Sequence, residues 1–234
     1  MPPKLPHRYD RNMSALAPED CALLRERRVV VVGCGGLGGT VAELLARIGV
    51  GYLRLIDSDV FEESNLNRQL MCTEETLRHP KALVAAERLE VVNSEVQVDA
   101  HITRIDEENV CELLDGTDCV VDCLDNLEAR FWTAHACQQL GTPLVYGAIA
   151  GWFGQVCTVF PGDPSFATLY GVPFDANQRS QHEELGNLPF TACATASVQA
   201  AEAVKVLLGR PDVMRNRLLM LDLLGGTADD VELQ

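Results

Sequence analysis

Apolar residues in the first part of the chain follow two different spacings. The segment RVVVV (28–32) is apolar after its first residue and ends at Gly33, as expected for a strand buried on both faces of a sheet. From Leu37 to Ile48 the apolar residues recur every three or four positions, which predicts a helix that stops at Gly49. A second apolar segment, YLRLID, follows. The pattern therefore predicts a strand, a glycine turn, a helix and a second strand in succession.

The rest of the chain alternates between the same two patterns, and Pro80 is a typical opening residue of a helix. We expect helices at 81–93, 127–140 and 192–209, strands at 96–105 and 118–125, two strands within 143–162 joined around Gly151 to Gly154, and a last strand at 217–224. Alternating strands and helices predict an α/β, Rossmann-like fold. Its mostly parallel sheet would have helices on both faces and antiparallel strands added in the C-terminal half.

The length of 234 residues fits one α/β domain with a full-sized core. We therefore predict a single domain over residues 1–234, with a helical N-terminal arm at 1–26. Residues 163–190 are polar and irregular, which predicts a mobile crossover loop.

The amino-acid composition limits the classes of binding partner and indicates the cellular compartment. The formal net charge of −15 argues against nucleic acid or an anionic membrane surface as a general partner, because phosphate binding depends on Lys and Arg. No apolar run approaches the roughly 20 residues that span a bilayer, and the first residues do not resemble a signal peptide. The nine cysteines are scattered and include no C-x-x-C pair, which is typical of reduced thiols. We expect a cytoplasmic protein.

The glycine turn is the first feature that points to a ligand. Gly33, Gly35 and Gly38 have the G-x-G-x-x-G spacing, which lets the backbone approach phosphates at the start of a helix. Asp57 follows Gly33 by 57 − 33 = 24 residues, close to the roughly 20 expected for an acid that binds ribose. These features predict a bound nucleotide, and they fit an NAD enzyme as well as an ATP enzyme.

The next segment, DSDVFEESNLNRQ, separates these two classes. Hydride transfer needs no cation at the phosphates, whereas an enzyme that attacks the phosphates needs cations to stabilise the charge that develops there. Asn65 and Arg68 would lie within reach of a triphosphate, and Lys81 opens the next helix. Asp122 and Asp125 end a predicted strand, where one of them could hold Mg²⁺ through its oxygens.

Several motifs now carry a resemblance. The segments RYDRN, GCGGLG, DSDVFEESNLNRQ, HPKA, DCLDN, YGAIAGWFGQVCTVFPG and ASVQAAEAVKVLLG, in this order, resemble the MoeB/ThiF/HesA family, relatives of the ubiquitin-activating enzymes. The resemblance implies an adenylyltransferase that uses ATP and Mg²⁺. The C-terminal glycine carboxylate of a small ubiquitin-like sulfur carrier, ending in Gly-Gly, would attack the α-phosphate. Pyrophosphate would leave, and an acyl-adenylate would remain.

The resemblance also implies roles for individual residues. The phosphate turn would consist of Gly33, Gly35, Gly36 and Gly38. Asp57 would bind the ribose, and Asp59 would help to position it. The phosphates would be bound by Asn65, Arg68 and Lys81, and the metal ion by Asp125. Arg11 matches an arginine that reaches the neighbouring subunit's ATP in this family, so a homodimer is expected. Asn12 stands where the family has Gln. Because a carboxylate is already ionised at neutral pH, the reaction needs charge neutralisation and positioning rather than a general base.

The chain departs from the family at its zinc site. Many relatives hold zinc with two C-x-x-C pairs, but Ser165 and Thr168 occupy the first pair's positions, and the C-terminal segment GGTADDVELQ has no cysteine. Hydroxyls are poor zinc ligands beside thiolates, so we expect no zinc. Cys193 lies at the start of a predicted helix, where the dipole would lower a thiol pKa, and this makes it a candidate for a covalent step. We favour the alternative, a small core residue within TACATAS.

Three other functions stay open. A relative of this family activates a modified tRNA nucleoside, although the net charge of −15 counts against tRNA. An NAD(P) oxidoreductase would leave NLNRQ and DCLDN without a role. An inactive scaffolding subunit of a heterodimer should have lost the phosphate or metal residues, and this chain retains them. The sequence does not identify the carrier, its pathway or the sulfur donor.

Overall fold

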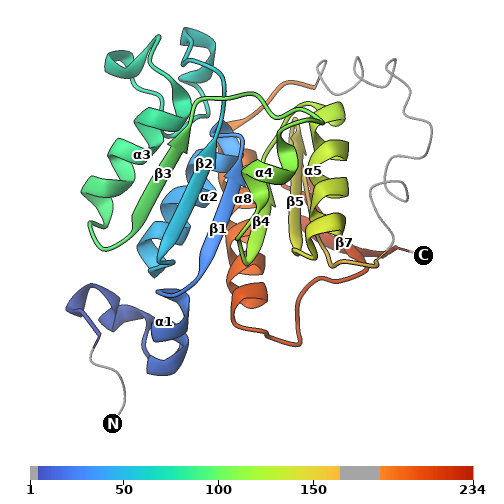
Figure 1. The fold of residues 1–234 in the computed structure, drawn as a ribbon. Coiled ribbons are helices and arrows are strands. Elements are labelled where there is room, and N and C mark those ends of the chain that lie inside the picture. Colours follow the sequence, from blue (N-terminus) through green and yellow to red (C-terminus); the bar gives the residue numbers. More distant parts are fainter. Residues whose placement is uncertain (1–4, 164–184, 234) are drawn as a thin grey trace.

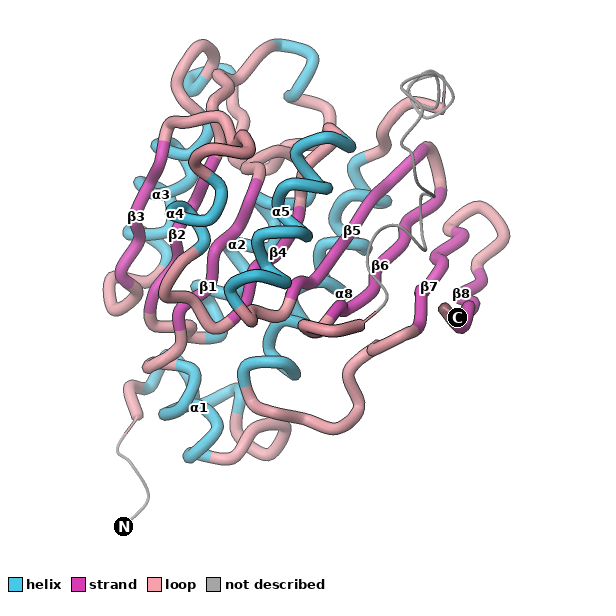
Figure 2. The backbone as a smooth tube through the Cα atoms, turned by 45° about the vertical axis from the view of Figure 1, so that its right-hand side comes forward, coloured by secondary structure: helices cyan, strands magenta, loops and turns pink. Residues whose placement is uncertain are grey.

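A single eight-stranded sheet organises the part of the chain that the computed structural model describes, residues 5–163 and 185–233. Its strands are β1 (Arg28–Val32), β2 (Tyr52–Ile56), β3 (Gln97–His101), β4 (Cys119–Asp122), β5 (Leu144–Ala150), β6 (Phe153–Val159), β7 (Arg217–Asp222) and β8 (Thr227–Glu232). The spatial order is β3-β2-β1-β4-β5-β6-β7-β8. The first five in this order are parallel and the last three are antiparallel additions (Figure 2). The predicted fold class is confirmed.

Helices cover the parallel part of the sheet on both faces (Figure 1). One face carries α2 (Gly36–Ile48), α3 (Lys81–Val92) and α8 (Pro189–Leu207), and the other carries α4 (Val110–Leu114) and α5 (Leu127–Leu140). Alternate valines of β1 belong to different cores, with Val29 and Val31 on the α2 and α8 side and Val30 and Val32 on the α5 side. This explains why the strand is continuously apolar.

The N-terminal arm packs against the end of α2 that is remote from the glycine turn. It consists of η1 (His7–Asn12) and α1 (Pro18–Leu24). Tyr9 is only 2% exposed, and its hydroxyl accepts a hydrogen bond of 2.9 Å from the buried amide of Asn93. Its ring fills the space beside Gly49, the left-handed residue (φ 98°) that ends α2. These contacts fix the N-terminal arm to the α/β domain of its own chain.

Several predicted boundaries need correction. The hairpin between β5 and β6 turns at Gly151 and Trp152, and Gly154 lies within β6. The strand predicted at 118–125 ends at Asp122. The strand predicted as the last, at 217–224, is followed by a further strand, β8. All six residues of β8 are exposed, so its sequence TADDVE has no alternation of apolar and polar residues that would predict a strand. The five-residue α4 was not predicted either.

The predicted crossover loop at 163–190 falls mostly outside the described residues. Its end can be compared, because α8 begins at Pro189, three residues before the predicted start of that helix. In the described part of the chain, no helix is both long and apolar enough to cross a membrane.

Candidate active site

The glycine turn joins β1 to α2 at the edge where the parallel strands end, at the top of Figure 1. Gly33 has a φ of 88°, and a Cβ at this position would lie 2.8 Å from the carbonyl oxygen of Cys123. A Cβ on Gly38 would lie 1.7 Å from the carbonyl oxygen of Gly33. These two glycines are therefore required by the turn itself and by its contact with the end of β4.

Gly35 and Gly36 are required less by packing. A Cβ on Gly35 would make ordinary contacts with Gln69, at 3.5 Å from Nε2, and one on Gly36 would lie 3.4 Å from Cβ of Ala192. Gly35 is the N-cap of α2, whose first N–H groups have no intrahelical partner. Backbone donors at the start of a helix, without side chains over them, can bind a phosphate.

Asp57 connects the end of β2 to this turn. Its Oδ2 accepts a hydrogen bond of 2.7 Å from the backbone N–H of Cys34, and its Oδ1 accepts one of 2.8 Å from the N–H of Asp59. Burial raises the pKa of Asp57, although the two N–H donors and the nearby Lys81 oppose the shift. The carboxylate thus lies directly beside the turn, where an acid that binds ribose would be expected.

Lys81 brings a largely buried positive charge to the same place. Its Nζ lies 3.0 Å from Oδ2 of Asp59, and its side chain is 10% exposed. The backbone N–H of Lys81 also donates to the carbonyl of Asp59 at 2.9 Å. The two ends of the segment 57–81 are therefore joined by hydrogen bonds between Asp59 and Lys81. These bonds place the Lys81 ammonium next to the carboxylates that follow β2.

Asn65 and Arg68 lie on the loop between β2 and α3. The Asn65 carboxamide is 7% exposed and accepts a hydrogen bond of 3.1 Å from the N–H of Glu62, so it holds its own turn. Arg68 donates to the carbonyl of Ser64 at 3.0 Å and to Oδ1 of Asn67 at 2.9 Å. Its Cγ would lie 3.6 Å from a Cβ at Gly36. The aliphatic part of the Arg68 side chain thus lies beside the glycine turn, and the side chain is long enough to bring its guanidinium to a ligand bound there.

The two acids at the end of β4 have different environments. Asp122 is fully buried, accepts from the N–H of Leu124 at 2.9 Å and pairs with Nη1 of Arg130 at 3.2 Å. Burial raises the pKa of Asp122.

Asp125 is exposed and has no hydrogen-bond partner among the described residues. Asn126 caps α5, accepting from the N–H groups of Glu128 and Ala129. Asp125 is therefore the carboxylate of this strand end that can meet a metal ion.

Known proteins resemble this chain over nearly its whole length. A model described as "ThiF family" matches residues 9–234. The chain belongs to the ThiF family. The SAMP-activating enzyme E1 of Haloferax volcanii is 38% identical over 229 residues, which are 96% of this chain and 84% of that protein. The sulfur carrier protein adenylyltransferase of Thermus thermophilus is 38% identical over 225 residues, 93% of this chain and 83% of that protein.

Solved structures agree in fold. The structure of E. coli MccB with ATP superposes with a TM-score of 0.86 at 21% identity, covering 98% of this chain and 72% of that chain. At this identity the likeness concerns the fold alone. The family and its curated relatives make this ThiF-family chain an adenylyltransferase.

The structure brings most of the predicted residues of this ThiF-family chain to one edge of the sheet, but not Arg11. Val32 of β1 pairs with Ile56 and with Asp122, so the residues that follow all three strands share that edge. Arg11 lies on η1, at the other end of α2, whose 13 residues span about 20 Å. Arg11 cannot serve the glycine turn of its own chain.

Two further buried residues lie at this edge, Arg130 and Gln69, and the sequence predicted no role for either. Arg130 also donates to the carbonyl oxygens of Gly147, at 3.0 Å, and Leu124, so it holds the loop that carries Asp125. The signal was an arginine within the helix LEARFWTAHACQQL, close after a strand that ends in an acid. Gln69 is the last residue of the motif DSDVFEESNLNRQ, and the family resemblance implied no role for it.

Cys193 is the fifth residue of α8, because this helix begins at Pro189. The effect of the helix dipole falls off within the first turn. The helix start therefore gives no reason to expect an activated thiol, and the position predicted for Cys193 at the start of α8 is wrong.

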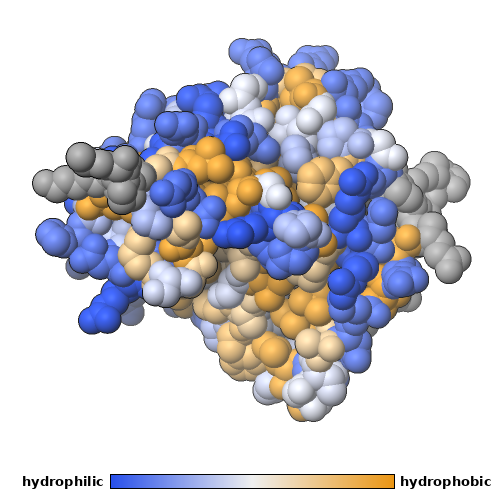
Figure 3. All heavy atoms as spheres, turned by 90° about the horizontal axis from the view of Figure 1, so that it is seen from below, coloured by the Kyte–Doolittle hydropathy of each residue, from blue (hydrophilic) through white to orange (hydrophobic). Residues whose placement is uncertain are grey.

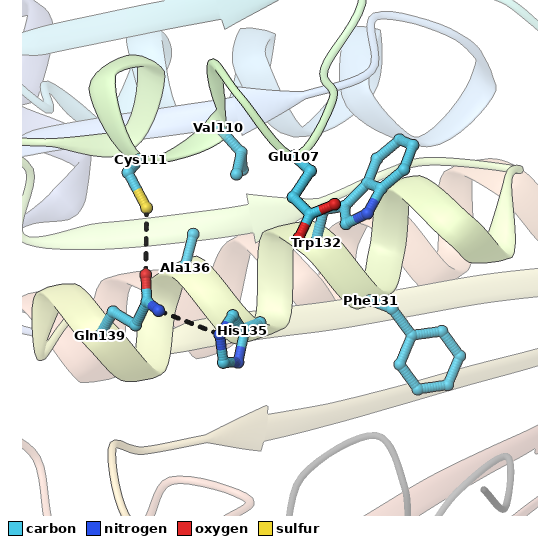
Figure 4. Close-up of a pocket in the computed structure, with 8 residues that line it drawn as sticks. All are labelled: Glu107, Val110, Cys111, Phe131, Trp132, His135, Ala136 and Gln139. Carbon is cyan, nitrogen blue, oxygen red and sulfur yellow. Dashed lines mark hydrogen bonds between the residues drawn. The ribbon is translucent and has the colours of Figure 1, made fainter. Parts of the chain in front are cut away.

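A pocket of about 430 Å³ lies between α4 and α5 (Figure 4). At one end, Sγ of Cys111 lies 3.3 Å from Oε1 of Gln139, whose Nε2 lies 3.0 Å from Nε2 of His135. Glu107 and Trp132 line the other end. None of the predicted site residues lines this pocket.

Proposed function

We propose that this chain transfers AMP from ATP to the C-terminal glycine carboxylate of a small ubiquitin-like sulfur carrier ending in Gly-Gly. The observation that carries this proposal is the set of charges around the glycine turn, namely Asp57, Arg68, Lys81 and Asp125. Two relatives that share 38% of their aligned residues with this chain are named for activating such proteins or for adenylating a sulfur carrier.

The proposed reaction is a displacement at phosphorus. An oxygen of the carrier's carboxylate forms a bond to the α-phosphorus, and the bond from this phosphorus to the oxygen bridging to the β-phosphate breaks. Pyrophosphate leaves with the electron pair. Arg68 and Lys81 stabilise the charge on the phosphate oxygens, and the N–H groups at the start of α2 hold the phosphates.

Mg²⁺ fits this site through Asp125. No group of three metal-binding side chains lies together in the described parts of the chain. Mg²⁺ does not require one, since it is commonly bound by one or two carboxylates with substrate phosphates and water. Asp122 is committed to Arg130, which leaves the exposed Asp125 for this role. When bound, the ion supplies charge neutralisation at the phosphates.

ATP–pyrophosphate exchange tests the proposal. The purified chain is incubated with Mg²⁺, ATP, labelled pyrophosphate and candidate carriers ending in Gly-Gly, each compared with the same carrier lacking its last glycine. Exchange that depends on the intact carrier supports the proposal. Binding of ATP without exchange for any carrier contradicts the proposed substrate, and failure to bind ATP contradicts the proposal as a whole.

We also propose a cytoplasmic location. All nine cysteines are free, and most are buried among apolar side chains. This use of cysteine is typical of a reducing compartment.

The alternatives of a modified tRNA nucleoside or NAD as substrate gain no support from the relatives named above.

A homodimer would give Arg11 a role. The arm holds Arg11 exposed at the far end of α2, a helix about 20 Å long that separates it from its own glycine turn. Figure 3 shows apolar residues gathered in the middle of the face seen from below, on the arm's side of the molecule. Apolar surface of this kind is typical of contacts between proteins. We propose that Arg11 completes the site of a second copy.

Mixing two inactive variants should restore activity if Arg11 acts between subunits. Arg11→Ala and Asp125→Ala are each expected to exchange pyrophosphate at least about 100-fold more slowly than the unmodified protein. After co-refolding, about half of the dimers are mixed and each contains one complete site, so about a quarter of the full activity should return.

In the control, Arg11→Ala is mixed with the double variant Arg11→Ala, Asp125→Ala in place of Asp125→Ala. This mixture contains no Arg11, so no activity should return. Native mass spectrometry counts the mixed dimers. If mixed dimers form and activity stays absent, Arg11 does not act in trans.

A further inference from the structure

The side-chain oxygen Oε1 of Gln69 is buried beside the glycine turn and has no hydrogen-bond partner among the described residues. The residue is 6% exposed, and its Oε1 is shielded from water and accepts no hydrogen bond from the described residues. A buried carboxamide oxygen that lacks a donor is a cost to the folded chain. Its persistence at a ligand site therefore needs a reason.

The position of this side chain is set by its backbone. The N–H of Gln69 donates to the carbonyl of Asn65 at 2.9 Å, and its own carbonyl accepts from Cys72 at 2.8 Å. The carboxamide then lies over Gly35, where a Cβ would be 3.5 Å from Nε2 and 4.0 Å from Oε1. Gln69 thus fills the space next to the glycine turn, whose N–H groups would face the phosphates of the proposed nucleotide.

We propose that Gln69 is a positioning residue of the nucleotide turn, whose Oε1 gains a hydrogen-bond donor when the turn is occupied. The donor is either a backbone N–H of the turn, moved by the bound phosphate, or a polar hydrogen of the nucleoside. The unpaired oxygen destabilises the empty site and is satisfied in the occupied one, so it favours binding. This inference rests on the proposed binding of ATP at the turn.

The test variant is Gln69→Met, which keeps the length of the side chain and removes the oxygen. Without ligand, the unpaired atom is gone, so the melting temperature should stay the same or rise by about 2–4 °C. The dissociation constant for ATP, measured by titration calorimetry, should increase about tenfold. A residue with only a structural role would lower the melting temperature.

Gln199 provides the matched control. It is also a buried glutamine at this edge, but its Nε2 donates to the carbonyl of Asp122 at 2.9 Å and its Oε1 accepts from Sγ of Cys123 at 3.8 Å. Gln199→Met removes satisfied hydrogen bonds, and its melting temperature without ligand should fall. The two variants should therefore shift the melting temperature of the empty protein differently.

The outcomes separate this inference from the proposed function. If the unmodified protein binds ATP and Gln69→Met binds it equally well, or if Gln69→Met melts earlier, the inference is overturned and the proposed function is untouched. If the unmodified protein does not bind ATP, the proposed function fails first and the inference with it. A second ligand, tripolyphosphate, identifies the donor. Equal weakening for tripolyphosphate and ATP indicates the N–H of the turn, whereas weakening for ATP alone indicates the nucleoside.

Discussion

Replacing Arg68 with alanine is expected to slow ATP–pyrophosphate exchange by about 100- to 1,000-fold. Cγ of Arg68 lies next to Gly36, so the guanidinium at the end of this side chain can turn toward the phosphates and stabilise the negative charge that develops on them. Within the described residues it makes only local hydrogen bonds, to Ser64 and Asn67, so its loss should leave the fold intact. Exchange rates at saturating and limiting ATP, with the melting temperature, measure the effect.

Arg47 supplies the control for Arg68. It is an arginine of α2 at the end away from the turn, 55% exposed and paired with Glu43 at 2.7 Å. Arg47→Ala should exchange pyrophosphate like the unmodified protein. If Arg68→Ala keeps its rate as well, or loses it only because the protein unfolds, Arg68 is not a catalytic residue.

Arg130→Met is expected to destabilise the protein by about 3–5 kcal/mol, the usual cost of leaving one charge of a buried ion pair alone. Asp122 would then be buried without its guanidinium partner, and the carbonyl of Gly147 would lose a donor. Urea unfolding at pH 7 measures the difference in the free energy of unfolding.

The same variant should respond to pH in a defined direction. Burial already raises the pKa of Asp122 in the folded protein, and Arg130 opposes this shift, so Arg130→Met raises the pKa further. A raised carboxyl pKa gives stability that is full below the unfolded pKa of about 3.9 and is lost as the pH rises through the folded pKa. The gap between the variant and the unmodified protein should therefore narrow as the pH falls.

A double variant separates charge from packing. Asp122→Asn combined with Arg130→Met removes both charges, so it should recover part of the stability lost in Arg130→Met alone. A double variant less stable than Arg130→Met would mean that the buried carboxylate was not the cause of the loss.

The sequence predicted the glycine turn and the elements around it because their signals are local. The β1 strand is apolar on both faces, and Gly33 and Gly38 are fixed by contacts of under 3 Å that admit no Cβ. Since parallel strands end at one edge, the acid that follows β2 had to lie near the turn.

Other features depend on distant contacts or lack a pattern. The pairing of Asp122 with Arg130 depends on how α5 lies against β4, which residue spacing alone does not fix. The β8 strand forms because it pairs with β7, although its own residues are exposed on both faces. Gln69 could not be identified, since an unpaired oxygen is visible only when all its neighbours are known.

The placement of the glycine turn between two strands has a consequence for biosynthesis. The N–H of Gly33 donates to the carbonyl of Ile56 at 2.8 Å, and its Cα packs against the carbonyl of Cys123. The turn is translated early, but its second supporting strand emerges from the ribosome about 90 residues later. A nascent chain shorter than this has the glycines of the turn without one of the two strand ends that shape them, so the turn takes its folded shape late in translation although its motif is made first.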